Sequence, residues 1–507
     1  MVALSLVQSI SLLGALTTPP PLSRRDAVGS AAVAAAAFPL LSVPFAARAA
    51  DKTTVRAAWT ATDGFSDKSF ISFDEGAYAA MRDDVRRTPL FEEAIKRRLA
   101  KAPRGTLTVL DVGTGPYALL ALAAARAGAK KVYTIEANAE AASRARAAIK
   151  KASDVPTGTI QVIEGFSTSI DLPEKVDVLV AEIAGSIASE EGAIATIRDA
   201  QSRLVKQPGD PSSYIPYACQ TIGAPASYAL HYALGPPQVS DAVCIIQSPV
   251  AATHAHVLAP TFFERRMRPR HSLSISLAHP RRVQFDWAKL KEPVRLNCRD
   301  QTAQLLADPQ LIEDFKFSDL SLPVSGVAAL RSAAPSGGGV PPLSWTVDPA
   351  RVVINEKTFY DELKKEGAKE VSTLAGTDAA FSSPRPIASS RRLVPSPPPI
   401  ASYPHLHPRL RLPQAEAREL SKAVSKSFSG IAMWPRLILD EEATLIVESR
   451  GPKGEHQKSH WQTVLPLMAA RPPAVEPGSV VRVAYSVDLR DGKVASPLKY
   501  LLEGEIA

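Results

Sequence analysis

Cysteine is scarce in this chain of 507 residues, which contains only Cys219, Cys244 and Cys298. An odd number without paired spacing argues against a disulfide framework and against a zinc site, so we expect buried reduced thiols and no metal. Internal repeats are also absent. A hydrophobic fraction of 45% and a charged fraction of 22% exclude a wholly disordered chain. This length allows roughly two to four domains.

Acidic residues are missing from the segment 379–415, which carries five arginines and nine prolines. Such a composition cannot form a packed core, so it predicts a disordered polyproline insertion or a docking motif for proline-binding domains. A wrongly translated intron is the alternative. Together with residues 1–50, this segment holds seven of the eight net positive charges. The remainder is nearly neutral, which argues against nucleic-acid binding.

Charge is also missing from the first 22 residues of the chain. A twin arginine at 24–25 precedes an uncharged, alanine-rich run that ends in a small-residue cleavage pattern at 47–50. These features resemble a twin-arginine export signal, and the apolar segment before it resembles the leaders of algal plastid proteins. We therefore expect 1–50 to be a cleaved or disordered leader to the plastid or thylakoid. The alternative is a cytoplasmic or nuclear protein with a misassigned start. Two prolines in the run argue against a stable membrane span.

Short apolar strands alternate with helices from residue 106 onward. We expect strands at 106–112, 131–135, 159–164 and 176–180, and helices at 119–127 and 139–151. This alternation predicts an α/β fold, with a mainly parallel sheet covered on both faces. After residue 216 the apolar stretches shorten, including those at 294–298, 436–448 and 480–489, and prolines and glycines separate them. That pattern predicts a mainly β second half.

Ligand-binding features stand at the carboxyl ends of the predicted parallel strands. Gly113-Thr114-Gly115 would let the backbone approach a ligand, and Glu136 could accept hydrogen bonds from ribose hydroxyls. The glycine loop alone fits NAD and S-adenosyl-L-methionine (SAM) equally well. Glu182 follows the fourth strand, at the edge where open parallel sheets bind ligands, and Glu191 lies nine residues further on.

Four stretches together resemble the protein arginine N-methyltransferase family, in the same order along residues 59–507. They are Met81-x-x-Asp84-x-x-Arg87, the loop 109–115 with Glu136, the acids Glu182 and Glu191, and Ser459-His460-Trp461. The resemblance implies a Rossmann-like SAM-binding domain over 51–214 and a β-barrel domain for substrate binding and dimerisation over 215–507. It also implies a homodimer that transfers a methyl group from SAM to a guanidinium nitrogen of arginine in protein substrates.

The same resemblance implies a role for each site residue. Glu182 and Glu191 would hold the guanidinium, and His460 would pair with Asp84 to brace the site. Carboxylates suit this task because the guanidinium and the SAM sulfonium are both cations. Arg87 would bind the SAM carboxylate. The remaining cofactor contacts would come from Met81, Asp111, Gly113, Gly115, Glu136 and Ser169.

Several positions leave alternatives open. Tyr117 stands where the family usually has glycine, and Ser169 stands where the family presents an adenine-contacting Glu. Glu190, the preceding residue, is the alternative to Glu191 as the second acid. We expect Phe65, Phe70 and Phe73 to be core contacts rather than a substrate lid, and the basic stretch 265–270 to be a solvated loop. The product, monomethylated or symmetrically or asymmetrically dimethylated, stays open. The rival functions are SAM-dependent methylation of a small cationic molecule and binding of SAM or protein without turnover.

Overall fold

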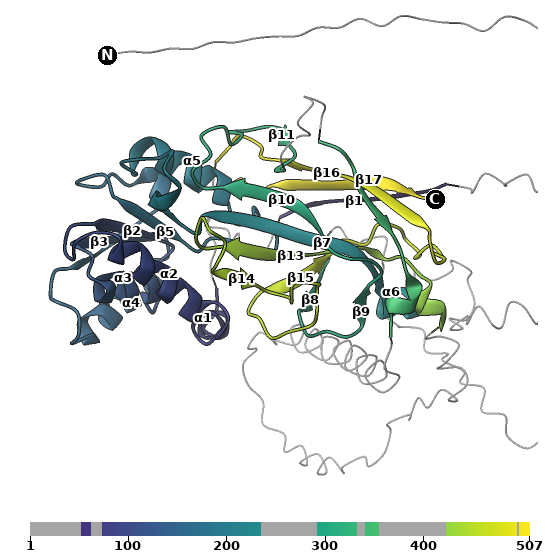
Figure 1. Ribbon diagram of the computed structural model, residues 1–507, viewed down its shortest axis with the longest axis horizontal. Helices are drawn as coiled ribbons and strands as arrows, with labels where there is room; N and C mark the ends of the chain where they lie inside the picture. The colour runs from purple at the N-terminus through teal and green to yellow at the C-terminus, as the bar shows by residue number, and fades with distance from the viewer. Residues whose placement is uncertain (1–51, 62–72, 235–291, 332–339, 354–421, 494–495) are drawn as a thin grey trace, which may run out of the picture. The chain divides into compact units, whose positions relative to one another are not determined.

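The structure is a computed structural model that describes residues 52–61, 73–234, 292–331, 340–353, 422–493 and 496–507 (Figure 1). All of them belong to one compact unit, Asp51–Ala507. The expected leader, the basic stretch at 265–270, the proline-rich segment, Phe65, Phe70 and Cys244 lie outside the described residues.

A five-stranded parallel sheet forms the first half of the fold. Its strands are β2 (Thr108–Val112), β3 (Lys131–Glu136), β4 (Ile160–Glu164), β5 (Val178–Ala181) and β6 (Tyr214–Ile215). The strand order is β4-β3-β2-β5-β6, and every neighbouring pair is parallel. Every residue of β2 and β5 is buried, because both strands are covered by other elements on each face. This arrangement confirms the expected Rossmann-like fold.

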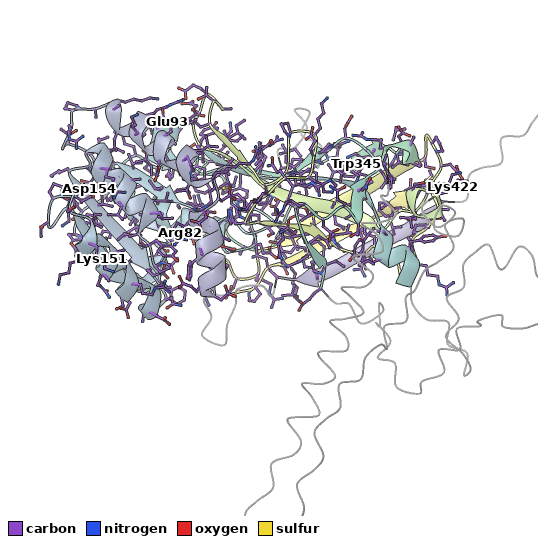
Figure 2. The ribbon with its side chains drawn as sticks, turned by 90° about the horizontal axis from the view of Figure 1, so that it is seen from below. Arg82, Glu93, Lys151, Asp154, Trp345 and Lys422 are labelled. Atoms are coloured by element: carbon purple, nitrogen blue, oxygen red, sulfur yellow. The ribbon has the colours of Figure 1, made fainter. Side chains whose placement is uncertain are left out.

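Helices connect and cover these strands. They are α1 (Glu75–Arg82), α2 (Thr88–Ala100), α3 (Leu119–Ala127), α4 (Ala139–Lys151) and α5 (Ala193–Arg203), with short 3-10 turns at Ser167–Ser169 and Pro211–Ser213. Helix α4 begins where the Asn138 side chain accepts hydrogen bonds from the N–H groups of Glu140 and Ala141. Its exposed end carries Lys151, and Asp154 follows it on the outside of the molecule (Figure 2).

Two antiparallel sheets form the second half, as the mainly β pattern predicted. One contains β1 (Thr53–Thr60), β17 (Lys499–Ile506), β16 (Val480–Asp488), β11 (Val327–Ala328) and β12 (Leu343–Thr346). The other contains β10 (Gln310–Lys316), β7 (Ala218–Tyr228), β13 (Gly430–Ile438), β15 (Gln462–Leu465), β8 (Val294–Asn297), β9 (Ala303–Leu305) and β14 (Ile446–Glu448). Short helical elements at Ala229–Leu234 (α6) and Pro349–Arg351 adjoin them. The sheets make a barrel-like second domain.

Strand β1 differs from the sequence expectation. Its residues fall in the segment 51–214 that we assigned to the methyltransferase domain, yet β1 pairs along its whole length with β17 at the end of the chain. The pairing buries Val55 and Trp59, and Trp59 stacks on Tyr500 at 5.1 Å between ring centroids. Alternate side chains of β1 thus reach the core of the second domain, which explains why this strand joins that sheet.

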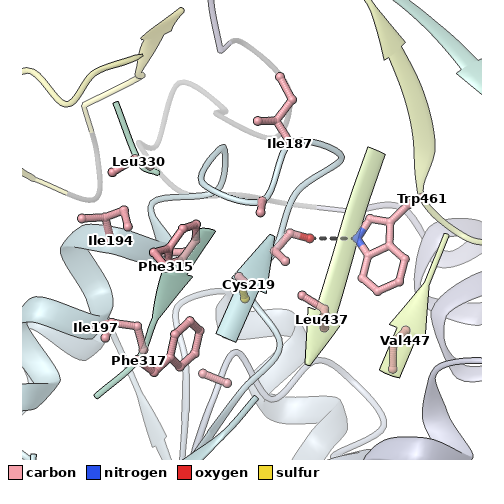
Figure 3. Close-up of a cluster of buried hydrophobic side chains, with 14 of the residues drawn as sticks. Ile187, Ile194, Ile197, Cys219, Phe315, Phe317, Leu330, Leu437, Val447 and Trp461 are labelled. Carbon is pink, nitrogen blue, oxygen red and sulfur yellow. Dashed lines mark hydrogen bonds between the residues drawn. The ribbon is translucent and has the colours of Figure 1, made fainter. Parts of the chain in front are cut away.

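One hydrophobic cluster runs from the parallel sheet into the antiparallel sheets. Figure 3 shows part of it, where Phe315 of β10 and Phe317, which follows that strand, lie beside Ile194 and Ile197 of α5. Cys219 and Cys298 are free and buried, as expected, and burial raises the pKa of both thiols. Within the ranges given above, no helix has the length and apolarity that crossing a membrane requires. No metal-binding group of side chains occurs among the same residues.

Candidate active site

A cavity of about 520 Å³ opens at the carboxyl ends of the parallel strands, a size typical of small-molecule sites. Both halves of the fold line it. The first half contributes residues of α1, of the glycine loop and of the ends of β3 and β5, and the second half contributes residues of β8 and of the loop before β15. The charged lining residues are Arg87, Glu136, Glu182, Glu190, Glu191 and Arg295, and His460 lies beside them.

The glycine loop and Glu136 form one end of the cavity. Gly113 and Gly115 have φ angles of 81° and 63°, which favour glycine over any residue with a Cβ. The Glu136 carboxylate accepts hydrogen bonds from the N–H groups of Gly115 and Asn138, both at 2.8 Å. Burial raises the pKa of Glu136, although these N–H groups act in the opposite direction. The acid is thereby fixed at the end of β3, where sheets of this type bind ribose.

Asp111 lies beneath the glycine loop and does not line the cavity. Its Oδ2 accepts a hydrogen bond from Thr134 Oγ1 at 3.1 Å, whereas its Oδ1 is buried without a hydrogen-bond partner. Burial raises the pKa of Asp111 to about 7. A buried carboxylate oxygen without a donor favours the protonated carboxyl group, which agrees with the raised pKa.

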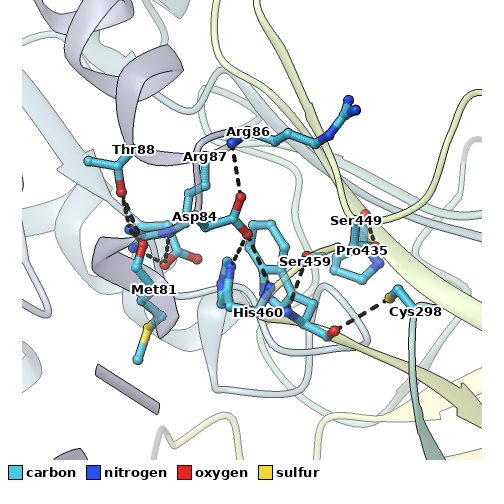
Figure 4. A network of polar contacts seen from close by, with 12 residues as sticks. Met81, Asp84, Arg86, Arg87, Thr88, Cys298, Pro435, Ser449, Ser459 and His460 are labelled. Atoms are coloured by element: carbon cyan, nitrogen blue, oxygen red, sulfur yellow. Dashed lines mark hydrogen bonds and ion pairs between the residues drawn. The ribbon is translucent and has the colours of Figure 1, made fainter. Parts of the chain in front are cut away.

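Asp84 and His460 meet at the second edge of the cavity (Figure 4). Asp84 Oδ2 lies 2.8 Å from His460 Nδ1 and accepts the His460 N–H at 3.1 Å, and Asp84 Oδ1 accepts the Arg86 N–H at 2.9 Å. Burial alone would raise the pKa of Asp84, but these hydrogen bonds outweigh it and lower the pKa to about 2. Asp84 is therefore an ionised acceptor, which places the proton of a neutral imidazole on Nδ1 and leaves Nε2 unprotonated.

Burial favours the neutral form of the His460 imidazole. Burial lowers its pKa, although the hydrogen bond to Asp84 acts in the opposite direction. The Trp461 ring lies 3.8 Å from the imidazole between centroids, and its Nε1 donates to Ala184 O at 2.8 Å (Figure 3). The loop before β15 is thus tied to the turn between α1 and α2 on one side and to the segment after β5 on the other.

Glu182 is held by Arg87. Arg87 Nε donates to Glu182 Oε2 at 2.9 Å, Arg87 Nη2 contacts the same oxygen, and both side chains are more than 90% buried. Sequence reasoning assigned Arg87 to the SAM carboxylate; in this structure its guanidinium orients the first of the two acids. Both groups line the cavity.

The adjacent acids Glu190 and Glu191 have different surroundings. Glu190 is 2% exposed and forms an ion pair with Arg295 of β8, whose Nη1 lies 3.3 Å from Glu190 Oε2. Glu191 is half-buried and lines the cavity. Glu190 therefore joins the acid loop, residues 182–192, to the second domain. Glu191 is the better placed of the two to receive a ligand.

The structure brings most of the predicted site residues to the cavity. Its lining includes Met81, Arg87, Gly113, Gly115, Glu136, Glu182, Glu191 and His460. Asp84 and Asp111 lie behind it. Ser169 does not line it either, because the 3-10 turn carries that residue past the wall, and Phe166 and Ser167 occupy the wall instead.

Phe73 and Tyr117 both line the cavity, and Phe73 differs from the sequence expectation. Phe73, expected in the core, lines the cavity and packs edge-on against Tyr78 at 5.7 Å. Tyr117 lines the cavity too, and its hydroxyl donates to Glu75 at 2.6 Å, which joins the glycine loop to α1.

Sequence reasoning missed Tyr78, Arg295 and Asn297, which also line the cavity. Tyr78 precedes Met81 by three residues, so helical spacing places it on the same face and could have revealed it. Arg295 and Asn297 are single polar residues in a short strand. No local pattern marks them, because only the pairing of β8 with β15 brings them to the site.

Comparisons with known proteins agree with the family resemblance. Residues 47–208 match the family described as ribosomal protein L11 methyltransferase (PrmA). Protein arginine N-methyltransferase PRMT10 of Arabidopsis thaliana is 43% identical over 102 residues, which are 20% of this chain and 26% of that protein. The arginine N(omega)-methyltransferase of Streptomyces achromogenes subsp. streptozoticus is 41% identical over 136 residues, 26% of this chain and 35% of that protein.

The chain thus spans about a quarter to a third of the length of these two relatives. The solved structure of Arabidopsis thaliana protein arginine methyltransferase 10 superposes with a TM-score of 0.45 at 16% identity, covering 84% of this chain and 92% of that one. The sequence matches confirm the resemblance expected from the motifs. Over these segments the chain is thus similar to a methyltransferase family and to arginine N-methyltransferases.

Proposed function

We propose that this protein is a SAM-dependent protein arginine N-methyltransferase. The observation that carries the proposal is the position of Glu182 and Glu191 in the same cavity as the glycine loop and Glu136. That arrangement would bring a guanidinium held by two carboxylates next to a nucleoside cofactor. Positioning and preorganised charge would supply most of the acceleration.

The charges of the cavity support two cationic ligands. Four carboxylates and two guanidiniums line it among the described residues, so the lining has two formal negative charges when His460 is neutral. SAM has one net positive charge, and an arginine side chain has another. Together they would neutralise the cavity, which reduces the cost of bringing two cations into a partly desolvated site.

The residues present fit SAM. Glu136 would accept hydrogen bonds from the ribose hydroxyls, and Gly113 and Gly115, which have no side chains, would let the methionine portion approach the backbone of the glycine loop. Tyr78 and Phe166 offer aromatic surface in the same cavity. When bound, SAM supplies a methyl group on a positively charged sulfur.

The chain's own residues would then orient the acceptor and receive its proton. Arg87 fixes Glu182, which with Glu191 would hold the guanidinium so that one terminal nitrogen faces the methyl group. The nitrogen that gains the methyl group must lose a proton. The unprotonated Nε2 of His460 would be its acceptor, with Asp84 stabilising the imidazolium.

Methylation of free arginine is the second candidate. Its support is the 41% identity to the Streptomyces arginine N(omega)-methyltransferase. A protein that binds SAM or protein without turnover is the non-enzyme alternative. The three functions are separated by incubating labelled SAM with each of three acceptors in turn. These are an arginine-rich peptide, the same peptide with lysine in place of arginine, and free arginine. We expect label on the arginine peptide alone, and mass spectrometry of that product counts the methyl groups. No label on any acceptor, despite SAM binding, contradicts the proposal.

The assembly and the cellular address are further parts of the proposal. We propose a homodimer, because the sequence holds one set of cofactor motifs, and sedimentation of the purified protein tests it. We also propose that residues 1–50 direct the protein to the plastid. A fusion of residues 1–60 to a fluorescent protein in an algal cell should accumulate there, and a diffuse cytosolic signal contradicts that part.

A further inference from the structure

Glu313 is a completely buried carboxylate outside the cavity. It belongs to β10 of the second domain, 122 residues beyond Glu191, and its relative exposure is 0%. Burial raises its pKa, although its hydrogen-bond donors act in the opposite direction. Among the described residues its contacts are with hydroxyls and one backbone N–H, rather than with a cation. Burying a carboxylate costs free energy unless hydrogen-bond donors satisfy it. The groups that donate to Glu313 therefore show what the buried carboxylate holds in place.

The contacts of Glu313 converge on the back of the acid loop. Its Oε1 accepts hydrogen bonds from Ser189 Oγ at 2.6 Å and Tyr485 Oη at 2.5 Å. Its Oε2 accepts from Thr221 Oγ1 at 2.5 Å and from the Ser189 N–H at 3.3 Å. Ser189 thus gives Glu313 both its side chain and its backbone, two residues before Glu191.

The directions of the remaining hydrogen bonds fit an ionised Glu313. Thr221 Oγ1 donates to Glu313 and accepts the Ala188 N–H at 2.9 Å. Ser189 Oγ donates to Glu313 and can accept from Tyr500 Oη at 3.0 Å. The hydroxyls of Ser189, Thr221 and Tyr485 can therefore all donate to the carboxylate. Hydrogen bonds that converge on a charged acceptor are stronger than neutral ones and fix geometry more tightly.

We propose that Glu313 is a positioning residue for methyl transfer, which holds the acid loop from behind so that Glu191 faces the acceptor guanidinium. Three polar groups of the loop, the N–H groups of Ala188 and Ser189 and the hydroxyl of Ser189, are attached to the second domain through this carboxylate and Thr221. The Arg295–Glu190 ion pair attaches the next residue. The acid loop therefore takes its geometry from the second domain, although it starts at the end of a parallel strand.

The inference rests on the proposed function, and the experiment separates the two. Glu313→Gln keeps the shape but replaces one acceptor oxygen with a donor group. Ser189→Ala removes the loop's hydroxyl and leaves the carboxylate in place. The matched control is Ser227→Ala, because Ser227 is an equally buried serine whose Oγ donates at 2.6 Å to Val424 O, away from the acid loop.

We expect Glu313→Gln and Ser189→Ala to lower kcat for the arginine peptide by about 10- to 100-fold, the scale of a misplaced reacting group. The Kd for SAM should change less than about twofold, because Glu313 does not touch the cavity. Ser227→Ala should keep the kcat of the wild-type protein, although it should lower thermal stability about as much as Ser189→Ala does. Equal kcat in Ser189→Ala and Ser227→Ala, or a parallel loss of SAM binding, overturns the inference.

Hydrogen exchange gives a readout that needs no activity. In Glu313→Gln, amides at 186–191 should exchange faster than in the wild-type protein, whereas in Ser227→Ala they should not. If the wild-type protein methylates no arginine acceptor, the proposed function fails, and this measurement still decides whether Glu313 holds the loop. Unchanged exchange at 186–191 in Glu313→Gln contradicts the anchoring itself.

Discussion

The imidazole Nδ1 of His460 lies 2.8 Å from Oδ2 of Asp84, although the two residues are 376 positions apart in the chain. This contact joins the turn between α1 and α2 to the loop before β15, and so connects the two halves of the fold beside the cavity (Figure 4). Because the carboxylate accepts from Nδ1, the contact also selects the imidazole tautomer. The link between the two halves of the fold and the choice of tautomer thus depend on the same hydrogen bond.

Asp84→Asn tests whether Asp84 sets the tautomer of His460. An asparagine amide can donate to Nδ1, which moves the imidazole proton to Nε2 and removes the proposed proton acceptor. We expect kcat to fall by about 100-fold or more. SAM binding should be kept, because Asp84 does not line the cavity. Turnover and SAM affinity, measured on the same preparation, check this, and unchanged turnover contradicts the assigned role of His460.

The low pKa of Asp84 also predicts how stability depends on pH. Its pKa is lowered from 3.8 to about 2 in the folded protein, so the folded state favours the ionised form. The resulting stabilisation is present above the unfolded pKa and is lost as the pH falls from about 4 to about 2. Thermal unfolding of the wild-type protein and Asp84→Asn should therefore differ at pH 6 and converge near pH 2. A difference that stays constant down to pH 2 contradicts the assignment.

Replacement of each adjacent acid by glutamine should separate stability from activity. Glu190→Gln leaves the Arg295 guanidinium without its ion-pair partner, which should lower the free energy of unfolding by about 3 kcal/mol. Glu191→Gln should leave stability close to that of the wild-type protein and abolish transfer, with SAM binding kept. Denaturant unfolding, SAM titration and peptide methylation check the pair. If the two variants exchange these phenotypes, Glu190 is the acid that binds the acceptor.

The parallel-sheet half of the fold and the end of the cavity formed by the glycine loop and Glu136 could be predicted from sequence, because the sequence patterns that indicate them are local. Apolar strands, the glycine loop and Glu136 follow each other within 30 residues, and the structure reproduces the bounds expected for α3 and α4. The surroundings of the acids could not be predicted. Arg295 and Glu313 reach the acid loop from strands more than 100 residues away, and only tertiary pairing brings them there. The same reason explains why β1 appeared to belong to the first domain.

The glycine loop allows a test in which backbone strain is the same in the variant and in its control. Gly113 and Gly105 have nearly equal φ angles, 81° and 78°, so alanine at either position costs about 1–2 kcal/mol of stability. At Gly105 an added Cβ meets nothing within 4 Å, whereas at Gly113 it lies 3.4 Å from Ile183 at the cavity wall. We therefore expect similar destabilisation in both variants but weakened SAM binding in Gly113→Ala alone. Calorimetric titration with SAM checks this. Equal SAM affinity in the two variants would show that the backbone at Gly113 does not approach the cofactor, and the cofactor end of the cavity would then need reassignment.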